Sequence, residues 1–272
     1  MSAEPGSAGL WSPQVTSTAV ARSPTGWCHR GVTPPVPPAR PTLRDAYADL
    51  VLGGACVGCA RPGRLLCPDC RADLPTIAHT AWPTPSPPGL VRPVAAAPYD
   101  GTVKQLVLGL KERRLLGLAA PLARLMALAV REAMTGVDVP VVLVPVPSRP
   151  SSVRERGLDS TYVVTDRAAR LLRREGGQVA AVRLLRTRPG VVDQAGLDAA
   201  HRAANLAGSM TCPSPALRRL ARRRPRTLVV ICDDVVTTGS TAREAQRALE
   251  SVGLRVLAVA AVAATAKRSA AR

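Results

Sequence analysis

Short runs of apolar residues alternate along this chain with stretches in which apolar residues recur every three or four positions. The short runs are rich in β-branched residues, which is typical of strands that are covered on both faces of a sheet. We expect such strands at 94–97, 141–146, 179–185, 228–231 and 254–263. The longer stretches have helical spacing. We expect helices at 43–52, 103–110, 116–130, 159–175 and 242–252.

Buried strands that alternate with amphipathic helices predict an α/β domain with a mainly parallel sheet. We place this domain at residues 94–266. Ligands of such sheets bind beyond the C-terminal ends of the strands. Polar loops follow two of the expected strands, at 147–157 and at 233–241. The sequence therefore predicts a ligand site where these two loops meet.

The loop after the strand 228–231 begins with two adjacent acids, Asp233 and Asp234, where the strand would end. A turn rich in hydroxyl groups follows, and then a helix. Backbone N–H groups and hydroxyls at the positive end of a helix can hold a phosphate. The acids would repel a phosphate, but they can accept hydrogen bonds from ribose hydroxyls. The candidate phosphate-binding residues are Thr237, Thr238, Gly239, Ser240 and Thr241.

The loop after the strand 141–146 is rich in arginine. A guanidinium can donate two hydrogen bonds to one anion, so arginines are well suited to binding pyrophosphate. A glycine in the same loop gives the backbone additional freedom. The candidate pyrophosphate-binding residues are Ser148, Arg149, Arg154, Arg156 and Gly157.

These polar segments also have simpler interpretations. An aspartate after a strand is often only a turn former or a helix cap. The loop 147–157 can be an arginine-rich surface loop that caps a helix beginning near Asp159. The segment 217–226 has six arginines in ten residues, which indicates either a solvated helix end or a nucleic-acid contact. It has no interleaved aromatic residues that would support base stacking.

Two CxxC pairs, separated by seven residues, lie in the segment 43–75. Each pair can hold Zn²⁺ through two thiolates, and together they complete a tetrahedral site of four sulfurs. Four thiolates leave no open coordination position, so we expect a structural metal. The alternative is a redox dithiol, which usually lies at a helix N-terminus in a thioredoxin-like fold. The candidate zinc ligands are Cys56, Cys59, Cys67 and Cys70.

Composition defines the remaining segments. Residues 1–42 are rich in Pro, Ser, Gly and Ala without any period, which predicts disorder. The Pro-rich segment 76–93 is expected to be a linker, and 267–272 a loose basic tail. Apolar residues make up 46% of the 272 residues, enough for a sizeable core. Because the chain has no Phe, that core must be built from Ala, Val and Leu.

The formal net charge of +18 favours polyanionic partners such as nucleotides, pyrophosphate or nucleic acid. The chain has no uninterrupted run of about 18 apolar residues, so no membrane span is predicted. The N-terminus lacks the apolar region of a secretory signal. Cysteines in CxxC pairs fit a reducing compartment, so we expect a cytoplasmic protein.

The segment 227–241, TLVVICDDVVTTGST, resembles the phosphoribosyl pyrophosphate motif of type I phosphoribosyltransferases. Within that group the chain is most similar to the ComF family, because its CxxC pairs resemble the zinc ribbon of that family. The segment PYDGTVKQLVLGLKERR also resembles the family's entry into the transferase domain, with Tyr99, Lys104 and Lys111 in the expected places. The family has a flexible loop, called the lid here, that folds over the active site. The spacing of its residues is matched by Arg186, Gln194, Arg202 and Asn205.

The resemblance implies displacement at the anomeric carbon of Mg²⁺-bound phosphoribosyl pyrophosphate, with pyrophosphate leaving. The catalytic candidates are then Asp233, Asp234 and Arg154. The family pattern R-G-F-N-Q is replaced here by R-G-L-D-S at 156–160, which leaves open a protein that binds the ligand as a sensor without turnover. ComF proteins are also associated with competence and DNA uptake. This implies single-stranded DNA and competence proteins as alternative partners of a non-catalytic accessory factor.

Overall fold

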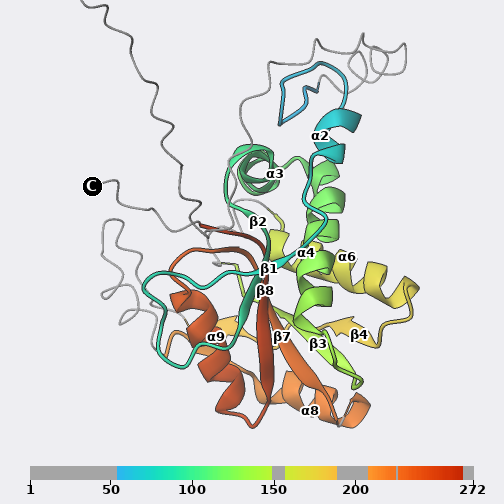
Figure 1. Ribbon diagram of the computed structural model, residues 1–272. Helices are drawn as coiled ribbons and strands as arrows, with labels where there is room; N and C mark the ends of the chain where they lie inside the picture. Colours follow the sequence, from blue (N-terminus) through green and yellow to red (C-terminus); the bar gives the residue numbers. More distant parts are fainter. Residues whose placement is uncertain (1–53, 149–156, 189–207, 225, 266–272) are drawn as a thin grey trace, which may run out of the picture. The chain divides into compact units, whose positions relative to one another are not determined.

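A six-stranded sheet forms the core of the protein in the computed structural model (Figure 1). The structure describes residues 54–148, 157–188, 208–224 and 226–265, all of which lie within one compact unit, Pro41–Arg272. The strand order is β1-β2-β8-β7-β3-β4, where β1 is antiparallel to β2 and every other pairing is parallel. This confirms the predicted α/β class with a mainly parallel sheet. The strands are β1 His79–Thr80, β2 Pro93–Pro98, β3 Val141–Pro145, β4 Val179–Ala181, β7 Leu228–Val236 and β8 Val256–Ala264.

The central strand β7 extends further than the sequence pattern indicates. Its pairing with β8 continues at Asp233, opposite Ala261, and at Val236, opposite Ala264. The expectation that the strand ends at the acids is therefore wrong. Two β-branched residues follow the acids, and Val236 is buried, so the strand resumes its apolar pattern beyond them.

Helices cover both faces of the sheet (Figure 1). Strand residues alternate between the two faces. Val230 and Cys232 of β7 therefore pack in the apolar cluster that includes α3, α4 and α6, whereas Val229 and Ile231 pack in the cluster that includes α8 and α9. All four side chains are fully buried, which explains why the run shows no polar alternation. The helices of the domain are α3 Gly101–Lys111, the 3-10 helix η1 Leu116–Leu118, α4 Ala119–Ala133, α6 Ser160–Arg174, α8 Ser214–Arg223 and α9 Ser240–Glu250.

The segment with the CxxC pairs packs against α3. It contains the short helix α2 (Pro68–Ala72) and an isolated bridge between Ala55 and Pro62. Cys56 and Leu66 belong to the same apolar cluster as the α3 residues. A Cβ on Gly58 would lie 3.0 Å from Thr102 Oγ1 of α3, so the backbone of the module comes close to that helix.

The Pro-rich segment expected to be a linker lies along α9. The Gln246 side chain accepts a hydrogen bond from the Val91 N–H at 3.0 Å and donates one to the Gly89 carbonyl at 3.0 Å. The Arg243 Nε donates to the Pro88 carbonyl at 2.9 Å. These bonds join the segment to the helix that follows the hydroxyl-rich turn.

A two-stranded antiparallel ribbon, β5 (Arg186–Thr187) with β6 (Met210–Thr211), completes the described structure. The buried Glu244 of α9 accepts a hydrogen bond from the Met210 N–H at 2.9 Å, and Arg247 donates to the Met210 carbonyl at 3.1 Å. The ribbon is therefore attached to α9. The predictions for residues 1–42, 43–52 and 267–272 lie outside the described residues.

Over the described residues, none of the helices combines the length and the apolar character that crossing a bilayer requires.

Candidate functional site

The strand order reverses between β3 and β7. From β3 the sheet continues to β4, and from β7 it continues in the opposite direction to β8. Ligands of open α/β sheets bind beyond the strand ends at such a reversal. β3 and β7 are parallel neighbours, with Pro145 opposite Cys232, so the chain leaves both strands at the same edge. The starts of the two polar loops therefore lie next to each other.

The two adjacent acids of β7 face opposite sides of the sheet. By strand alternation, Asp233 follows Ile231 towards α9, and Asp234 follows Cys232 towards α3 and α6. The contacts of Asp234 agree, because its Oδ2 forms an ion pair with Lys111 Nζ and accepts a hydrogen bond from Thr161 Oγ1 at 3.5 Å. The two acids thus have different closest partners, although the charges of Asp234 and Lys111 both act on Asp233.

The acids also differ in their partners. Both oxygens of Asp234 are used, since Oδ1 accepts a hydrogen bond from the Val235 N–H at 2.8 Å. Asp233 Oδ1 accepts one from the Asp234 N–H at 2.8 Å, but Asp233 forms no ion pair with any residue that the structure describes. Asp233 is therefore the acid without an ion-pair partner among the described residues.

Burial changes the protonation of this group of side chains. Burial, followed by the negative charge of Asp234, raises the pKa of Asp233 to about 8. Burial would lower the pKa of Lys111, but the charge and hydrogen bond of Asp234 outweigh it, and the pKa of Lys111 is raised overall. Burial and the neighbouring carboxylate thus favour the protonated form of Asp233, whereas the ion pair favours the charged form of Lys111.

The hydroxyl-rich turn joins β7 to α9. Gly239 is the N-cap residue of the helix and has a φ of 73°. Thr238 Oγ1 and Ser240 Oγ are hydrogen-bonded at 3.0 Å, Thr237 is exposed, and Thr241 lies in the first turn of α9. The first N–H groups of a helix have no intrahelical acceptor. The turn therefore presents hydroxyls and N–H groups at the positive end of an 11-residue helix.

The Pro-rich segment forms a wall against this turn. A Cβ on Gly239 would lie 3.0 Å from Pro83 Cγ and 3.1 Å from Leu90 Cδ2. Glycine is required here for two reasons, the left-handed backbone and the close approach of this wall. The wall comes from a segment that precedes the α/β domain in the sequence.

Part of the arginine-rich loop is described. Ser148 Oγ donates a hydrogen bond to Asp159 Oδ1 at 3.0 Å, and the same oxygen accepts one from the Tyr162 N–H at 3.1 Å. Asp159 is thus the N-cap residue of α6, as its position in the sequence indicates. Arg183 Nε lies 3.8 Å from Asp159 Oδ2, so the charge of this acid is partly compensated. Gly157 has a φ of 66°. The candidates Arg149, Arg154 and Arg156 lie outside the described residues.

Of the four lid candidates, Arg186 is described. It is exposed and lies on β5, opposite Thr211 of β6. The Arg188 N–H donates to the Ser209 carbonyl at 2.8 Å, so the chain on either side of 189–207 is joined at this ribbon. Gln194, Arg202 and Asn205 lie outside the described residues.

The four cysteines of the CxxC pairs come together, with all four sulfurs within 4.8 Å of one another. All four are free thiols, and Cys59 Sγ lies 3.6 Å from Cys67 Sγ. Four sulfurs that surround one Zn²⁺ at about 2.3 Å would be about 3.8 Å apart. The cluster is therefore compatible with a structural zinc ion.

Backbone N–H groups also point at these sulfurs. The Cys67 N–H donates to Cys56 Sγ and the Cys70 N–H to Cys67 Sγ, each at 3.4 Å. Burial acts to raise the pKa of Cys56, but hydrogen bonds from backbone N–H groups, that of Cys67 first, lower it to about 6. Burial raises the pKa of Cys67 and Cys70. The cluster thus already favours one thiolate.

Sequence reasoning did not identify the partners of Asp234. Lys111 ends a helix whose lysines a solvated face explains equally well, and Thr161 is one of several hydroxyl residues in its segment. Neither has a local signal that relates it to Asp234. The contacts arise because α3 and α6 pack on the same face of the sheet, next to the end of β7.

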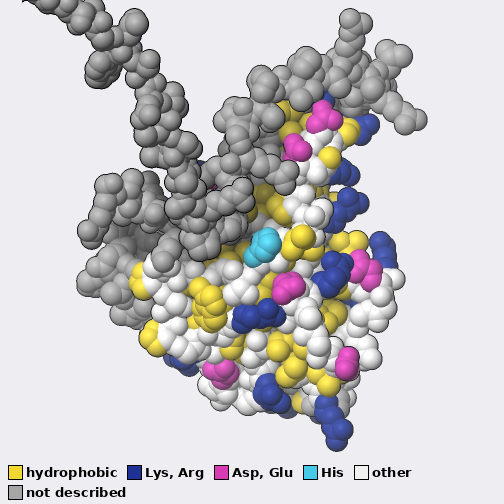
Figure 2. Space-filling view, in the orientation of Figure 1, with side chains coloured by type: hydrophobic (Ala, Val, Ile, Leu, Met, Phe, Trp, Pro, Cys, Tyr) yellow, Lys and Arg dark blue, Asp and Glu magenta, His cyan; other side chains and the backbone are white. Residues whose placement is uncertain are grey.

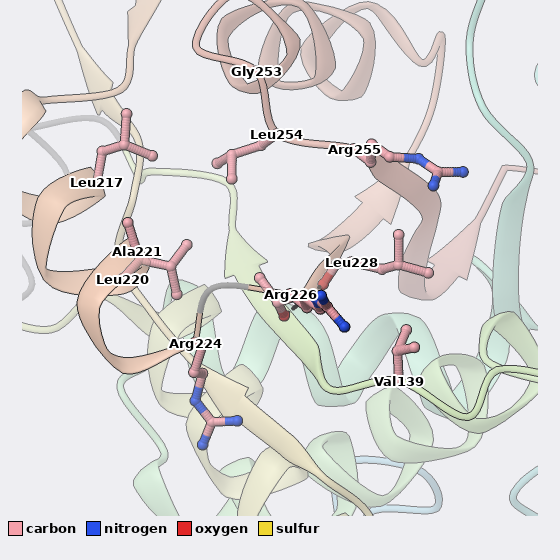
Figure 3. A pocket seen from close by; sticks show the side chains of 11 residues that line it. Val139, Leu217, Leu220, Ala221, Arg224, Arg226, Leu228, Gly253, Leu254 and Arg255 are labelled. Carbon is pink, nitrogen blue, oxygen red and sulfur yellow. Dashed lines mark hydrogen bonds between the residues drawn. The ribbon is translucent and has the colours of Figure 1, made fainter.

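A groove of about 380 Å³ lies at the opposite edge of the sheet, among α8, the start of β7 and the turn after α9. Its walls include Leu217, Leu220 and Leu254, and the guanidinium groups of Arg224 and Arg255 point away from one another (Figure 3). Lys and Arg are scattered over the face shown in Figure 2. Arg226 and Thr227 also line this groove, which lies at the other ends of the strands from the acid pair.

Comparisons with protein-family models and with curated proteins found no match.

We predict that Gly239→Ala destabilises the protein more than Gly253→Ala does. Both glycines have left-handed φ, where a Cβ costs about 1–2 kcal/mol. Gly253 has nothing within 4 Å of an added Cβ, whereas Gly239 meets the Pro83 and Leu90 side chains. The difference between the two free energies of unfolding, measured in urea, isolates the contact with the Pro-rich wall. Equal losses would contradict that contact.

We also predict a pH dependence of stability that arises from Asp233. Its pKa is raised in the folded state, so the folded protein binds a proton more tightly than the unfolded chain does. The contribution of Asp233 is then complete at low pH and is lost as the pH rises from about 4 to 8. Asp233→Asn should flatten this decline in the free energy of unfolding. Wild-type and variant profiles of the same slope would disprove the assignment.

Proposed function

We propose that this chain binds phosphoribosyl pyrophosphate at the C-terminal ends of β3 and β7, and that it is a phosphoribosyltransferase-like protein of the ComF type. The observation that carries the proposal is that two different loops begin next to each other at the reversal of the strand order. One follows the acid pair and contains the phosphate-type turn, and the other contains the arginines. Each alone has a simpler explanation, but a ribose that carries phosphates at both ends requires both.

The described residues and the sequence together support a role for each segment. The turn 237–241 and the start of α9 suit the 5′-phosphate, because they offer hydroxyls and N–H groups without a cation. Asp233 suits the ribose hydroxyls, since it forms no ion pair among the described residues and lies on the same side as α9. The loop 148–157, with Arg149, Arg154 and Arg156 in its sequence, suits the diphosphate.

The same arrangement can support glycosyl transfer. Displacement at the anomeric carbon forms a bond to the acceptor, breaks the bond to pyrophosphate and leaves the electron pair of that bond on the leaving group. Arginines and a ligand-bound Mg²⁺ would stabilise the developing charge. No general base is found beside the acids among the described residues. The same site would equally serve a protein that senses the ligand without turning it over.

A second function is favoured by the exposed arginines of α8. Arg218, Arg219, Arg222 and Arg223 project from the helix, and none has an ion pair with a described residue. Arginines of this kind release counterions from a phosphate backbone. They support a non-catalytic accessory factor that handles single-stranded DNA in competence.

We further propose that Cys56, Cys59, Cys67 and Cys70 bind a structural Zn²⁺. Four mutually close sulfurs with backbone N–H donors fit a closed thiolate site. Such an ion would hold the module together beside α3, because the described part of the module otherwise has only the five-residue α2 and one isolated bridge.

Calorimetric titration with phosphoribosyl pyrophosphate and Mg²⁺ tests the ligand. We expect binding by the wild type and a loss of at least about tenfold in affinity for Asp233→Ala/Asp234→Ala, because the hydrogen bonds of Asp233 to the ribose and the ion pair that holds Lys111 are removed together. Glu175→Gln, a change of an exposed acid away from the strand ends, is the matched control and should bind as the wild type does. Absence of binding by the wild type would refute the proposal. If binding is found, pyrophosphate release with a panel of bases and amines separates transfer from sensing.

Metal analysis tests the zinc site. Cys67→Ser should lose about one equivalent of zinc, because three thiolates hold the ion less tightly than four. Cys212→Ser changes a cysteine outside the cluster and should keep the full content. Unchanged zinc in Cys67→Ser would remove the assignment.

A further inference from the structure

The ion pair between Lys111 and Asp234 lies at the open edge of the sheet and not in the middle of the core. The Lys111 side chain is 30% exposed, while that of Asp234 is 13% exposed. Ion pairs in such places contribute little to stability, because the cost of removing the charges from water offsets their attraction. A contribution to stability therefore explains poorly why a lysine lies at the end of α3, in contact with Asp234.

The donors of Lys111 are only partly used. An ammonium group has three N–H donors and no acceptor. Among the described residues, Asp234 is the one with which Lys111 forms an ion pair, and no other hydrogen bond of the ammonium is seen there. The carboxylate, in contrast, has both oxygens in use. The partly exposed ammonium is thus the member of the pair that has N–H donors left for a further partner. That partner must be a hydrogen-bond acceptor.

The position of the ammonium indicates which part of a ligand it would meet. Asp234 Oδ2 joins it to Thr161, in the first turn of α6, which directly follows the arginine-rich loop. The hydroxyl-rich turn and α9 lie on the other side of β7. Lys111 therefore belongs to the half of the site that adjoins the arginine-rich loop, and it comes from a helix far from both loops in the sequence.

We propose that Lys111 binds the anomeric diphosphate of the ligand, and that Asp234 is a positioning residue that holds this ammonium in place. This inference rests on the proposed binding of phosphoribosyl pyrophosphate at the same site, and it assigns the recognition of the diphosphate to the described part of the chain. It makes Lys111 a specificity-determining residue, which distinguishes a ribose phosphate with an anomeric diphosphate from one without it. Asp233 and the turn 237–241 then bind the part that both ligands share.

The test compares two ligands, phosphoribosyl pyrophosphate and ribose 5-phosphate, each titrated calorimetrically with Mg²⁺. In Lys111→Met we expect the affinity for phosphoribosyl pyrophosphate to fall roughly 10- to 100-fold, because a charged hydrogen-bond donor is lost. The affinity for ribose 5-phosphate should stay within about threefold of the wild type. Lys111→Arg, which keeps a cation, should restore most of the discrimination. Lys104→Met, an exposed lysine of the same helix, is the matched control and should change neither affinity.

Each outcome distinguishes the inference from the function on which it rests. A wild type that binds neither ligand refutes both. A wild type that binds phosphoribosyl pyrophosphate, with a Lys111→Met variant that loses affinity for both ligands equally or for neither, overturns the role of Lys111 alone. If Lys111→Met does not fold, Lys111→Gln/Asp234→Asn removes both charges and keeps a hydrogen-bonded pair. A folded double variant that retains the wild-type ratio of the two affinities would also overturn the inference.

Discussion

The candidate site depends on two adjacent, partly buried carboxyl groups near the end of the central strand of the sheet. β7 pairs with β3 as far as Cys232 and with β8 beyond the acids, so the acids are held in a strand and not in a loop. A strand sends neighbouring side chains to opposite faces, and the fold provides a different solution on each. Asp234 forms an ion pair with the lysine that ends α3, and burial raises the pKa of Asp233. The chemical asymmetry of the site follows from this geometry.

Helix α9 connects the candidate site to the rest of the domain. Its first residues form the hydroxyl-rich turn, and its polar side chains hold two other segments. Gln246 and Arg243 bind the Pro-rich wall, and Glu244 binds the ribbon at Met210. Glu244 is almost fully buried, yet an ion pair with Arg247 and a backbone N–H compensate its charge. The position of the turn therefore depends on contacts made along the whole helix.

Much of this could be predicted from the sequence because its signals are local. The strand around Ile231 was predicted from an apolar β-branched run, and the cysteine cluster from the spacing of two CxxC pairs. The start of a helix near Asp159 was also predicted, and Asp159 is the N-cap residue of α6. Other features were missed for a physical reason. The acids were placed beyond β7, since two charges in a row resemble a strand end, and only the pairing with β8 carries the strand past them.

The sequence by itself determined the class of fold, the positions of the buried strands and the residue types available at their ends. These depend on hydrophobic periodicity and on residues that are neighbours in the chain. Only the tertiary structure decided which acid forms an ion pair, which has no such partner among the described residues, and that a Pro-rich segment packs against the turn at Gly239. These properties depend on which helices share a face of the sheet and on the approach of distant segments. Because side chains alternate along β7 and α3 packs near one face of it, the two aspartates have different partners.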